Sequence, residues 1–316
     1  MIPLFEDGLS DGSGPVRVLA VEGLGRSEVG RKSKKLRGAL EDQAGLVKAR
    51  AVKALGRSGD RSVIPLVETA TKDELATVRI TAYAALIKLG KKDLWEDLWK
   101  AANAANPEDR TEAMRAIAEL KDQRGFPLFV ELLAYTQPSV RGAAARGLGH
   151  LGRKEAREKI EPLLRDPIPA VREAALSSLA DLGSTESVPA ISPLLGDGQV
   201  TIRAAAVASL LQLGQPFEVV GATARALSQS NDTAARASIA FALGKATKPN
   251  AKDAIVFLSG FLADPLPGPK IVAIRSLGHL GDRELLPAMK DGLHDTNEAV
   301  RATAAGALLH FLQRKS

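Results

Sequence analysis

Residues 140–152 read Val-Arg-Gly-Ala-Ala-Ala-Arg-Gly-Leu-Gly-His-Leu-Gly, and variants of this stretch recur along the chain. Counted from Arg141, apolar residues stand three, seven and ten positions later, at Ala144, Leu148 and Leu151. On a helix of period 3.6 these positions form one apolar stripe. Gly152 follows, and glycine readily takes the left-handed conformation that ends a helix. The stretch therefore predicts an amphipathic helix with a defined end.

The basic residue that begins this pattern recurs at a nearly constant interval. Subtracting 31 repeatedly from Arg203 reaches a basic residue each time, and three further ones follow at intervals of 33, 34 and 31. The ten residues are Arg17, Lys48, Arg79, Arg110, Arg141, Arg172, Arg203, Arg236, Lys270 and Arg301. Such a period is the signature of a repeat protein whose unit is one supersecondary element. Copies are numbered below from one to ten, and positions within a copy are counted from its basic residue.

A further apolar segment precedes the predicted helix of each copy, often with a proline near its start. Examples are residues 63–67, 126–130, 188–191 and 285–288. Proline costs little in the first turn of a helix. Because a helix of about 12 residues with one apolar stripe is marginal alone, its stability must come from stacking on neighbouring copies. We therefore predict an all-α fold, an α-solenoid (α/α superhelix) of about ten helical hairpins with a period of 31 residues, forming one domain over residues 1–316.

The pattern resembles the HEAT repeat, and in particular the short bacterial form described in phycobilin lyases, from about Ile2 to Gln313. In HEAT repeats an Asp in the turn between the two helices pairs with the Arg. Here an Asp stands six residues before the basic residue in seven copies, at Asp11, Asp42, Asp73, Asp166, Asp197, Asp264 and Asp295. The resemblance thus implies a structural ladder that includes Arg17, Arg79, Arg141, Arg172, Arg203 and Arg301. Copies four, five and eight carry Ala104, Tyr135 and Ser230 instead, so we expect the ladder to be interrupted there.

Positions +5 and +9 have no packing role in this pattern and lie on one exposed face of the second helix. Since second helices line the concave side of HEAT solenoids, the resemblance implies that these positions floor a groove. The predicted groove residues are Arg26, Lys53, Arg57, Lys88, Arg115, Arg146, His150, Lys245, Arg275 and His279. The first five copies are mostly basic here, which favours a partner with acidic groups. The alternative is that these charges only solvate an exposed face.

Residues 26–37 form the densest basic run of the chain. The cations that follow the first turn are Arg31, Lys32, Lys34, Lys35 and Arg37, and we call them the outer basic patch. They fall in the first helix of copy two, so we expect them on the outer side. Such a run is either a solvated helix face or a site for phosphate or an anionic surface. No aromatic residue interleaves it, which disfavours single-stranded nucleic acid, whose bases stack on aromatic side chains.

Three further features lead to structural expectations. Position +6 is small in every copy, which predicts close contact with the adjacent repeat. Trp95 aligns with core positions of other copies, whereas Trp99 aligns with half-exposed ones. The longer eighth and ninth copies are expected to carry their extra residues in turns, around 228–232 and 264–269, either as tolerated insertions or as loops that contact a partner.

Composition excludes several classes of protein. There is no cysteine, which removes disulfides and thiolate metal sites. No apolar run approaches the ~20 residues of a membrane span, and the start lacks a basic region followed by an apolar one. The HEAT-built hydroxylases hold iron with His-Glu pairs, and no histidine here is followed by Glu. We therefore expect a cytoplasmic protein without metal or cofactor. Because copy one begins inside its first helix, the sequence leaves open whether a segment precedes Met1.

The sequence favours a non-enzymatic, monomeric scaffold or adaptor that binds a protein with an acidic surface or segment through the concave groove. The second hypothesis is binding of nucleic acid or of an anionic surface. The third, by resemblance alone, is a lyase that acts on a chromophore protein, as the phycobilin lyases do. A gel-shift at two salt concentrations distinguishes the first two hypotheses, because phosphate binding weakens steeply with salt.

Overall fold

The structure is a computed structural model that describes the backbone of residues 1–281 and 286–313, with their side chains except those of 249, 288 and 310–313. The described residues contain helices and turns and no β-strand, so the prediction of an all-α solenoid is confirmed. The chain divides into two compact units, Met1–Gly147 (unit 1) and Leu148–Ser316 (unit 2). The prediction of one domain over residues 1–316 stays a prediction.

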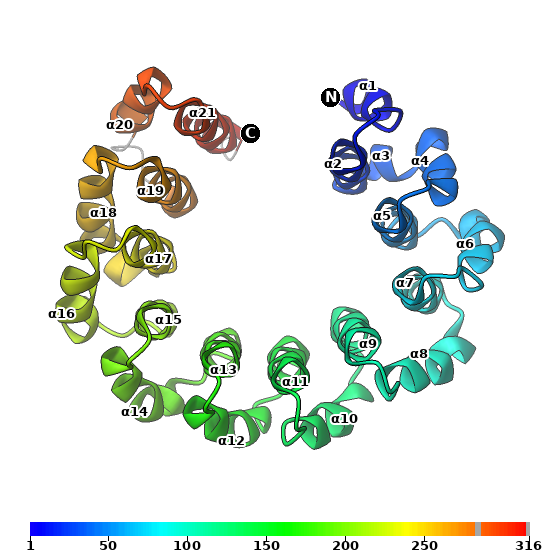
Figure 1. Cartoon of the computed structure of the whole chain (residues 1–316), viewed down its shortest axis with the longest axis horizontal. Helices are drawn as coiled ribbons and strands as arrows, with labels where there is room; N and C mark the ends of the chain where they lie inside the picture. Colours follow the sequence, from blue (N-terminus) through cyan, green and yellow to red (C-terminus); the bar gives the residue numbers. More distant parts are fainter. Residues whose placement is uncertain (282–285, 314–316) are drawn as a thin grey trace. The chain divides into compact units, whose positions relative to one another are not determined.

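Each copy contains the predicted second helix, and these helices form one layer, the B layer, within each unit (Figure 1). They are α2 (Gly14–Gly25), α5 (Gly45–Gly56), α7 (Ala76–Lys88), α9 (Pro107–Leu120), α11 (Pro138–Leu151), α13 (Pro169–Asp181), α15 (Val200–Gln212), α17 (Thr233–Leu243), α19 (Pro267–Leu280) and α21 (Glu298–Gln313). The unit boundary falls inside α11.

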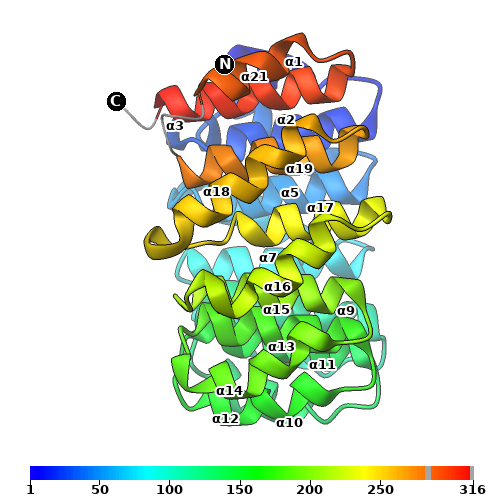
Figure 2. The same cartoon turned by 90° about the vertical axis from the view of Figure 1, so that its left-hand side faces the viewer.

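The first helices form the A layer on the other side of each unit. They are α1 (Ile2–Gly8), α3 (Glu28–Arg31) with α4 (Lys34–Gly38), α6 (Ile64–Ala70), α8 (Trp95–Ala102), α10 (Gly125–Leu132), α12 (Ala156–Ile160), α14 (Val188–Ile191), α16 (Phe217–Ser228), α18 (Ala251–Gly260) and α20 (Leu286–Asp291). Many are extended by short 3-10 turns, such as η4 (Glu161–Arg165) and η6 (Ser192–Gly196). Within unit 2, Figure 2 shows α16 and α18 in front of α15, α17 and α19.

Burial follows the predicted stripe. In unit 1, Ala51 and Leu55 of α5, and Ala82 and Leu86 of α7, have no solvent exposure, and they stand at +3 and +7 of copies two and three. In unit 2 the same positions of α13, α15 and α17 are equally buried. The core is thus a row of contacts between neighbouring hairpins, as stacking of marginal helices requires.

Glycines after the second helices take the predicted left-handed conformation. Gly59, Gly152, Gly183 and Gly214 have φ between 66° and 75°, and they stand at +11 of their copies. In copy four the same position is Lys121, with φ 52°, the one described non-glycine residue with positive φ. The predicted helix ends are confirmed.

The small residues at +6 contact the preceding repeat, as predicted, and the structure adds their partner. A Cβ built on Gly56, at +8 of copy two, would lie 2.5 Å from the Cβ of Ala85, at +6 of copy three. Gly244 stands in the same relation to Ser276 in unit 2. Because neither position can grow, successive B-layer helices pack closely there.

The extra residues of the longer copies do not lie in turns. In copy eight they belong to α16, which has 12 residues against 7 in α6, and in copy nine they lie before Asp264, where α18 has 10 residues. The expectation of turn insertions around 228–232 and 264–269 was therefore wrong. The added residues thus belong to the helical first arm of each copy, where Phe217 of α16 and Phe257 of α18 have ring centroids 5.1 Å apart.

Candidate functional site

The in-register cations form ion pairs between successive repeats rather than within one. Arg17 contacts Asp42, which belongs to copy two, at 2.7 Å from Nε and 2.9 Å from Nη2. Each further pair also joins a cation to the turn Asp of the next copy: Lys48–Asp73, Arg172–Asp197, Arg236–Asp264 and Lys270–Asp295. We call this series the ladder. The ladder is a set of ion pairs across the interfaces between repeats. The resemblance to HEAT repeats had implied that each pair forms within one repeat.

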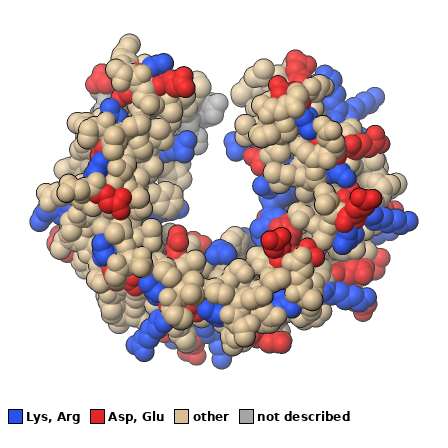
Figure 3. Space-filling model, viewed as in Figure 1, with Lys and Arg blue, Asp and Glu red and all other residues tan. Residues whose placement is uncertain are grey.

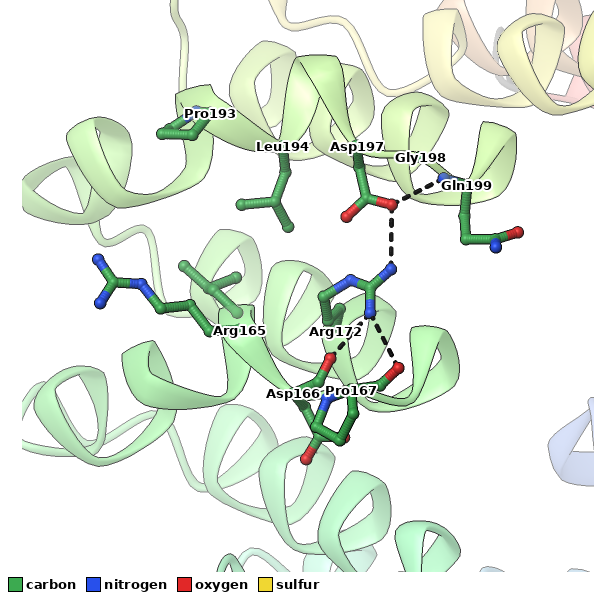
Figure 4. A pocket seen from close by; sticks show the side chains of 10 residues that line it. Arg165, Asp166, Pro167, Arg172, Pro193, Leu194, Asp197, Gly198 and Gln199 are labelled. Carbon is green, nitrogen blue, oxygen red and sulfur yellow. Dashed lines mark hydrogen bonds and ion pairs between the residues drawn. The ribbon is translucent and has the colours of Figure 1, made fainter.

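The same cations also bind the turn of their own copy. Figure 4 shows Arg172, whose Nη1 donates to the carbonyl oxygens of Asp166 and Pro167 while Nη2 contacts Asp197 at 3.0 Å. Asp197 in turn accepts a hydrogen bond from the backbone N–H of Gln199, just before α15. These residues line a pocket of about 510 Å³. The Arg therefore joins two turns, and the Asp also organises the start of a helix.

The interruptions of the ladder are displaced by one copy from the expected places. Ala104, Tyr135 and Ser230 remove the partners of the preceding copies, which are Arg79, Arg110 and Arg203. Arg79 and Arg203 donate only to backbone carbonyls of their own turns among the described residues. Arg110 also donates to a carbonyl oxygen of its own turn, that of Ala104, and in addition stacks on the ring of Tyr135, 4.3 Å from its centroid. The displacement follows because the partner Asp comes from the next repeat.

Two further predicted ladder residues keep the contact to their own turn. Arg141 donates to the carbonyl oxygens of Tyr135 and Thr136, and Arg301 donates to those of Asp295 and Thr296. This backbone contact is thus shared by ladder residues of both units.

The predicted groove residues of unit 1 belong to the B-layer helices α5, α7, α9 and α11 or directly follow α2 and α5. Three of them converge on one acidic residue of α9. Lys53 of α5 donates to Oε1 of Glu119 at 2.6 Å, Arg115 binds the same oxygen, and Arg57 lies 3.8 Å from Oε2. Glu119 is 66 residues from Lys53, with α7 between their helices. Contact across an intervening repeat shows that this B-layer surface is hollowed.

The charges of this cluster influence one another strongly. Burial alone would raise the pKa of Glu119, but the hydrogen bond from Lys53 and the charges of Lys53, Arg115 and Arg57 hold the pKa of Glu119 below its usual range. Burial lowers the pKa of Lys53, and contact with Glu119 opposes that effect only in part. The hydrogen bond from Arg115 to Glu112, reinforced by both carboxylates, raises the pKa of Arg115.

Two groove cations of unit 1 are exposed and without an ion pair among the described residues: Arg26, after α2, and Lys88, at the end of α7. Figure 3 shows Lys and Arg atoms along the inner rim of α5 and α7, next to acidic atoms where this surface reaches α9. Arg146 of α11 is exposed as well. The B-layer surface of unit 1 is therefore rich in cations, and only part of them is neutralised.

The groove residues of unit 2 do not form a comparable cluster. Lys245 lies 5.3 Å from the ring centroid of Phe241, beside a pocket of about 850 Å³ lined mostly by small residues of α13, α15 and α17. Arg275 and His279 line a separate pocket of about 440 Å³ between α19 and α21. His150 is exposed on α11. The side chain of His310, which shares the +9 position, lies outside the described residues.

The outer basic patch lies in α3 and α4 of the A layer, as expected, but most of its charges have partners within the chain. Lys32 contacts Glu28 at 2.7 Å, Lys35 contacts Asp7 at 3.6 Å and Arg37 contacts Asp60 at 3.4 Å. The fourth, Arg31, donates to the carbonyl oxygen of Gly25. Only Lys34 is without a partner among the described residues. The B-layer surface is the better candidate site.

The two tryptophans are both half-buried in α8. Their ring centroids lie 6.2 Å apart, and the guanidinium of Arg124 stacks on Trp95 at 4.1 Å. The prediction for Trp99 is confirmed, whereas the core position expected for Trp95 was wrong. Trp95 is the first residue of its helix, and its ring contacts the Arg124 guanidinium and the Trp99 ring.

Sequence reasoning missed the role of Glu119. The residue was visible as the one acid at +9 among the first five copies, but alignment of copies does not show which residues meet across an intervening repeat. Glu112, at +2 of the same copy, was also missed, although its i,i+3 spacing from Arg115 on one helix is visible in the sequence. A search for opposite charges at +5 and at +9 two copies later would have paired Lys53 with Glu119.

The family model for HEAT repeats matches the chain over residues 2–87, 33–118, 96–167, 126–212, 158–244 and 254–314. The chain belongs to the HEAT-repeat family. HEAT repeats are typical of protein-interaction scaffolds, because stacked hairpins offer long binding surfaces. A search of curated protein sequences finds no match.

The chain is similar to several solved structures at low sequence identity. A Kap121p mutant is 13% identical, with a TM-score of 0.51, over 99% of this chain and 42% of that one. The CpcE–CpcF complex of phycocyanin lyase from Nostoc sp. PCC7120 is 20% identical, with a TM-score of 0.46, over 71% of this chain and 94% of that one. Human deoxyhypusine hydroxylase is 18% identical, with a TM-score of 0.35, over 94% and 98%. At these identities the likeness concerns the fold.

Two searches of the described residues concern metals and membranes. Within residues 1–281 and 286–313, no three His, Asp or Glu side chains gather as metal ligands would. In the same part of the chain, no helix is both long and apolar enough to cross a bilayer.

Proposed function

We propose that this chain is a non-enzymatic scaffold that binds an acidic segment of a protein partner on the B-layer surface of unit 1. One observation carries the proposal: Arg26 and Lys88 are exposed there without ion pairs to any residue that the structure describes, while Lys53, Arg57 and Arg115 share Glu119. Packing imposes no charge at these positions. Exposed cations contribute little to stability, but they accelerate and orient association with an acidic partner.

The spacing of the cations favours an extended segment. Arg26, Arg57 and Lys88 stand at +9 of three successive copies. Neighbouring helices are about 8–10 Å apart, and a chain in the extended polyproline II conformation advances about 3.1 Å per residue with three residues per turn, so every third side chain faces the same way. An acidic residue at every third position of the partner would therefore meet one cation per repeat.

The test uses two fluorescent peptides of equal composition, one with Glu at every third position among glycines and one with the same Glu residues consecutive. We expect the spaced peptide to bind more tightly than the consecutive one. Its affinity should fall as the salt concentration is raised, because salt screens exposed charges. The double variant Arg26→Glu, Lys88→Glu should reduce its affinity about tenfold. The melting temperature should stay within about two degrees, as is usual for surface substitutions.

The matched control reverses two cations of the outer basic patch, Lys32→Glu and Lys34→Glu, and should leave peptide binding unchanged. Equal affinity of the double variant and the unchanged protein for the spaced peptide would contradict the proposal. Single- and double-stranded DNA of the same charge are tested in parallel. Tighter binding of DNA, with a steep loss on adding salt, would favour the nucleic-acid hypothesis instead.

A further inference from the structure

We infer that Glu119 occupies, within the chain itself, a carboxylate-binding site formed by Lys53, Arg57 and Arg115. The inference rests on the proposed function, since it names the part of the unit 1 surface where a partner's Asp or Glu side chain would be held most closely. Glu119 then acts as an internal competitor. An acidic partner binds fully only when its own carboxylate displaces that of Glu119.

The geometry of the cluster is that of an anion site. Cations from two helices, α5 and α9, approach one carboxylate from both sides, and Lys53 and Arg115 bind the same oxygen. The Lys53 side chain is 20% exposed, so water solvates its ammonium poorly. A cation in that state binds an anion more strongly than an exposed one does.

Glu119 can leave this site at modest cost. Its side chain is 35% exposed, so part of it already contacts water. Arg115 keeps Glu112 as a second carboxylate when Glu119 moves. The charge left without a partner is then that of Lys53 and Arg57, which an incoming carboxylate would neutralise.

There is room for an incoming side chain beside the cluster. A pocket of about 230 Å³ is lined by α5, α7 and α9, and its charged lining residues are three cations, Arg50, Lys53 and Arg115, and one acid, Glu112. Lys53 and Arg115 therefore border both the pocket and Glu119. The pocket begins at α5, the helix that Arg57 directly follows, and extends to α9. An Asp or Glu side chain is the occupant that its size and charge fit.

The test measures binding of fluorescein-labelled oligoglutamate to the unchanged protein and to Glu119→Gln. The Gln variant should bind about fivefold more tightly at low salt, because it frees two cations without creating a new acid. Glu112→Gln is the matched control, since it removes a neighbouring acid of α9 that contacts Arg115 alone among these cations. Its effect on affinity should be smaller. Thermal unfolding checks that both variants are folded.

A second measurement does not depend on peptide affinity. The ammonium of Lys53, followed by NMR in selectively labelled protein, should titrate at lower pH in Glu119→Gln than in the unchanged protein, because burial is then unopposed. Oligoglutamate should move the titration back upward. Glu119→Asp, whose carboxylate is withdrawn from Lys53, should give intermediate results for both measurements.

The outcomes separate the inference from the proposed function. If Arg26→Glu, Lys88→Glu weakens binding of oligoglutamate while Glu119→Gln leaves it unchanged, the surface binds acidic segments and the inference about Glu119 is wrong. If neither the unchanged protein nor Glu119→Gln binds oligoglutamate, both are wrong. Tighter binding by Glu119→Gln together with the return of the Lys53 titration supports both.

Discussion

Arg17 and Asp42 form a two-point ion pair that joins copy one to copy two, with Nε and Nη2 of the guanidinium 2.7 and 2.9 Å from the two carboxylate oxygens. Both side chains are nearly buried, at 8% and 11% exposure. Geometry of this kind is stronger and more specific than that of a single surface contact. The pair repeats along the chain, so the most regular charges of the sequence hold neighbouring repeats together.

Replacing a ladder Arg should therefore affect stability rather than binding. Arg172→Ala leaves Asp197 without its cation in a mostly buried place, which costs more than loss of an exposed pair. We expect the melting temperature to fall by several degrees while affinity for the acidic peptide is unchanged. Arg26→Ala, which removes an exposed cation without an ion pair among the described residues, is the control. It should weaken binding of the acidic peptide and leave the melting temperature unchanged. Weaker peptide binding by Arg172→Ala at full stability would reassign the ladder to the binding surface.

The ladder lacks an Asp opposite Arg79, and supplying one should stabilise the fold. Ala104 stands where Asp42 and Asp73 stand in their copies, and Arg79 has no acidic partner among the described residues. Ala104→Asp should supply the missing carboxylate and also accept a backbone N–H near the start of α9. Thermal unfolding should show a higher melting temperature. Ala104→Asn, which provides the second contact without the charge, should give a smaller rise, and an equal rise would show that pairing with Arg79 contributes nothing.

Acid should weaken the ladder over a defined range of pH. The hydrogen bond from Arg17 lowers the pKa of Asp42, and that from Lys270 lowers the pKa of Asp295. In unfolded chains Asp titrates near pH 3.9, so near that pH the unfolded state binds more protons than the folded one. This contribution to stability is complete above about pH 5 and is lost as pH falls through the lowered pKa values. Urea unfolding followed between pH 7 and pH 3 should show this loss, and Asp42→Asn should make it shallower.

The close packing of neighbouring B-layer helices can be tested by adding one methyl group at Gly56. In Gly56→Ala the new Cβ would lie 2.5 Å from the Cβ and 2.8 Å from the Cα of Ala85, so α5 and α7 must move apart. We expect lower stability, since overpacking of this kind typically costs about 1–3 kcal/mol. Gly38→Ala in α4 is the control, because no atom lies within 4 Å of its new Cβ. That variant should be neutral or slightly stabilising, as Ala is favoured over Gly in helices. Equal stability of the two variants would contradict the role given to Gly56.

The sequence by itself determined the repeat, the second helices and their ends. These features depend on neighbours within one copy: the stripe at +3, +7 and +10 buries Leu55 and Leu86, and the glycine at +11 takes a left-handed conformation at Gly183. Ten copies repeat the same local residue pattern, so the pattern can be recognised although single residues vary between copies. The side of the B layer that carries the cations followed from the same helical period.

Tertiary structure alone decided which charges meet. The turn Asp lies six residues before the cation of its own copy and 25 or more residues after the cation of the preceding copy. Sequence distance therefore favours pairing within one copy. The stacking of repeats instead places Arg17 against Asp42, which belongs to the next copy. Lys53 and Glu119 meet because the B-layer surface of unit 1 is hollowed, which brings together side chains of repeats that are not adjacent. Such contacts depend on how hairpins pack on one another, and no single copy contains that information.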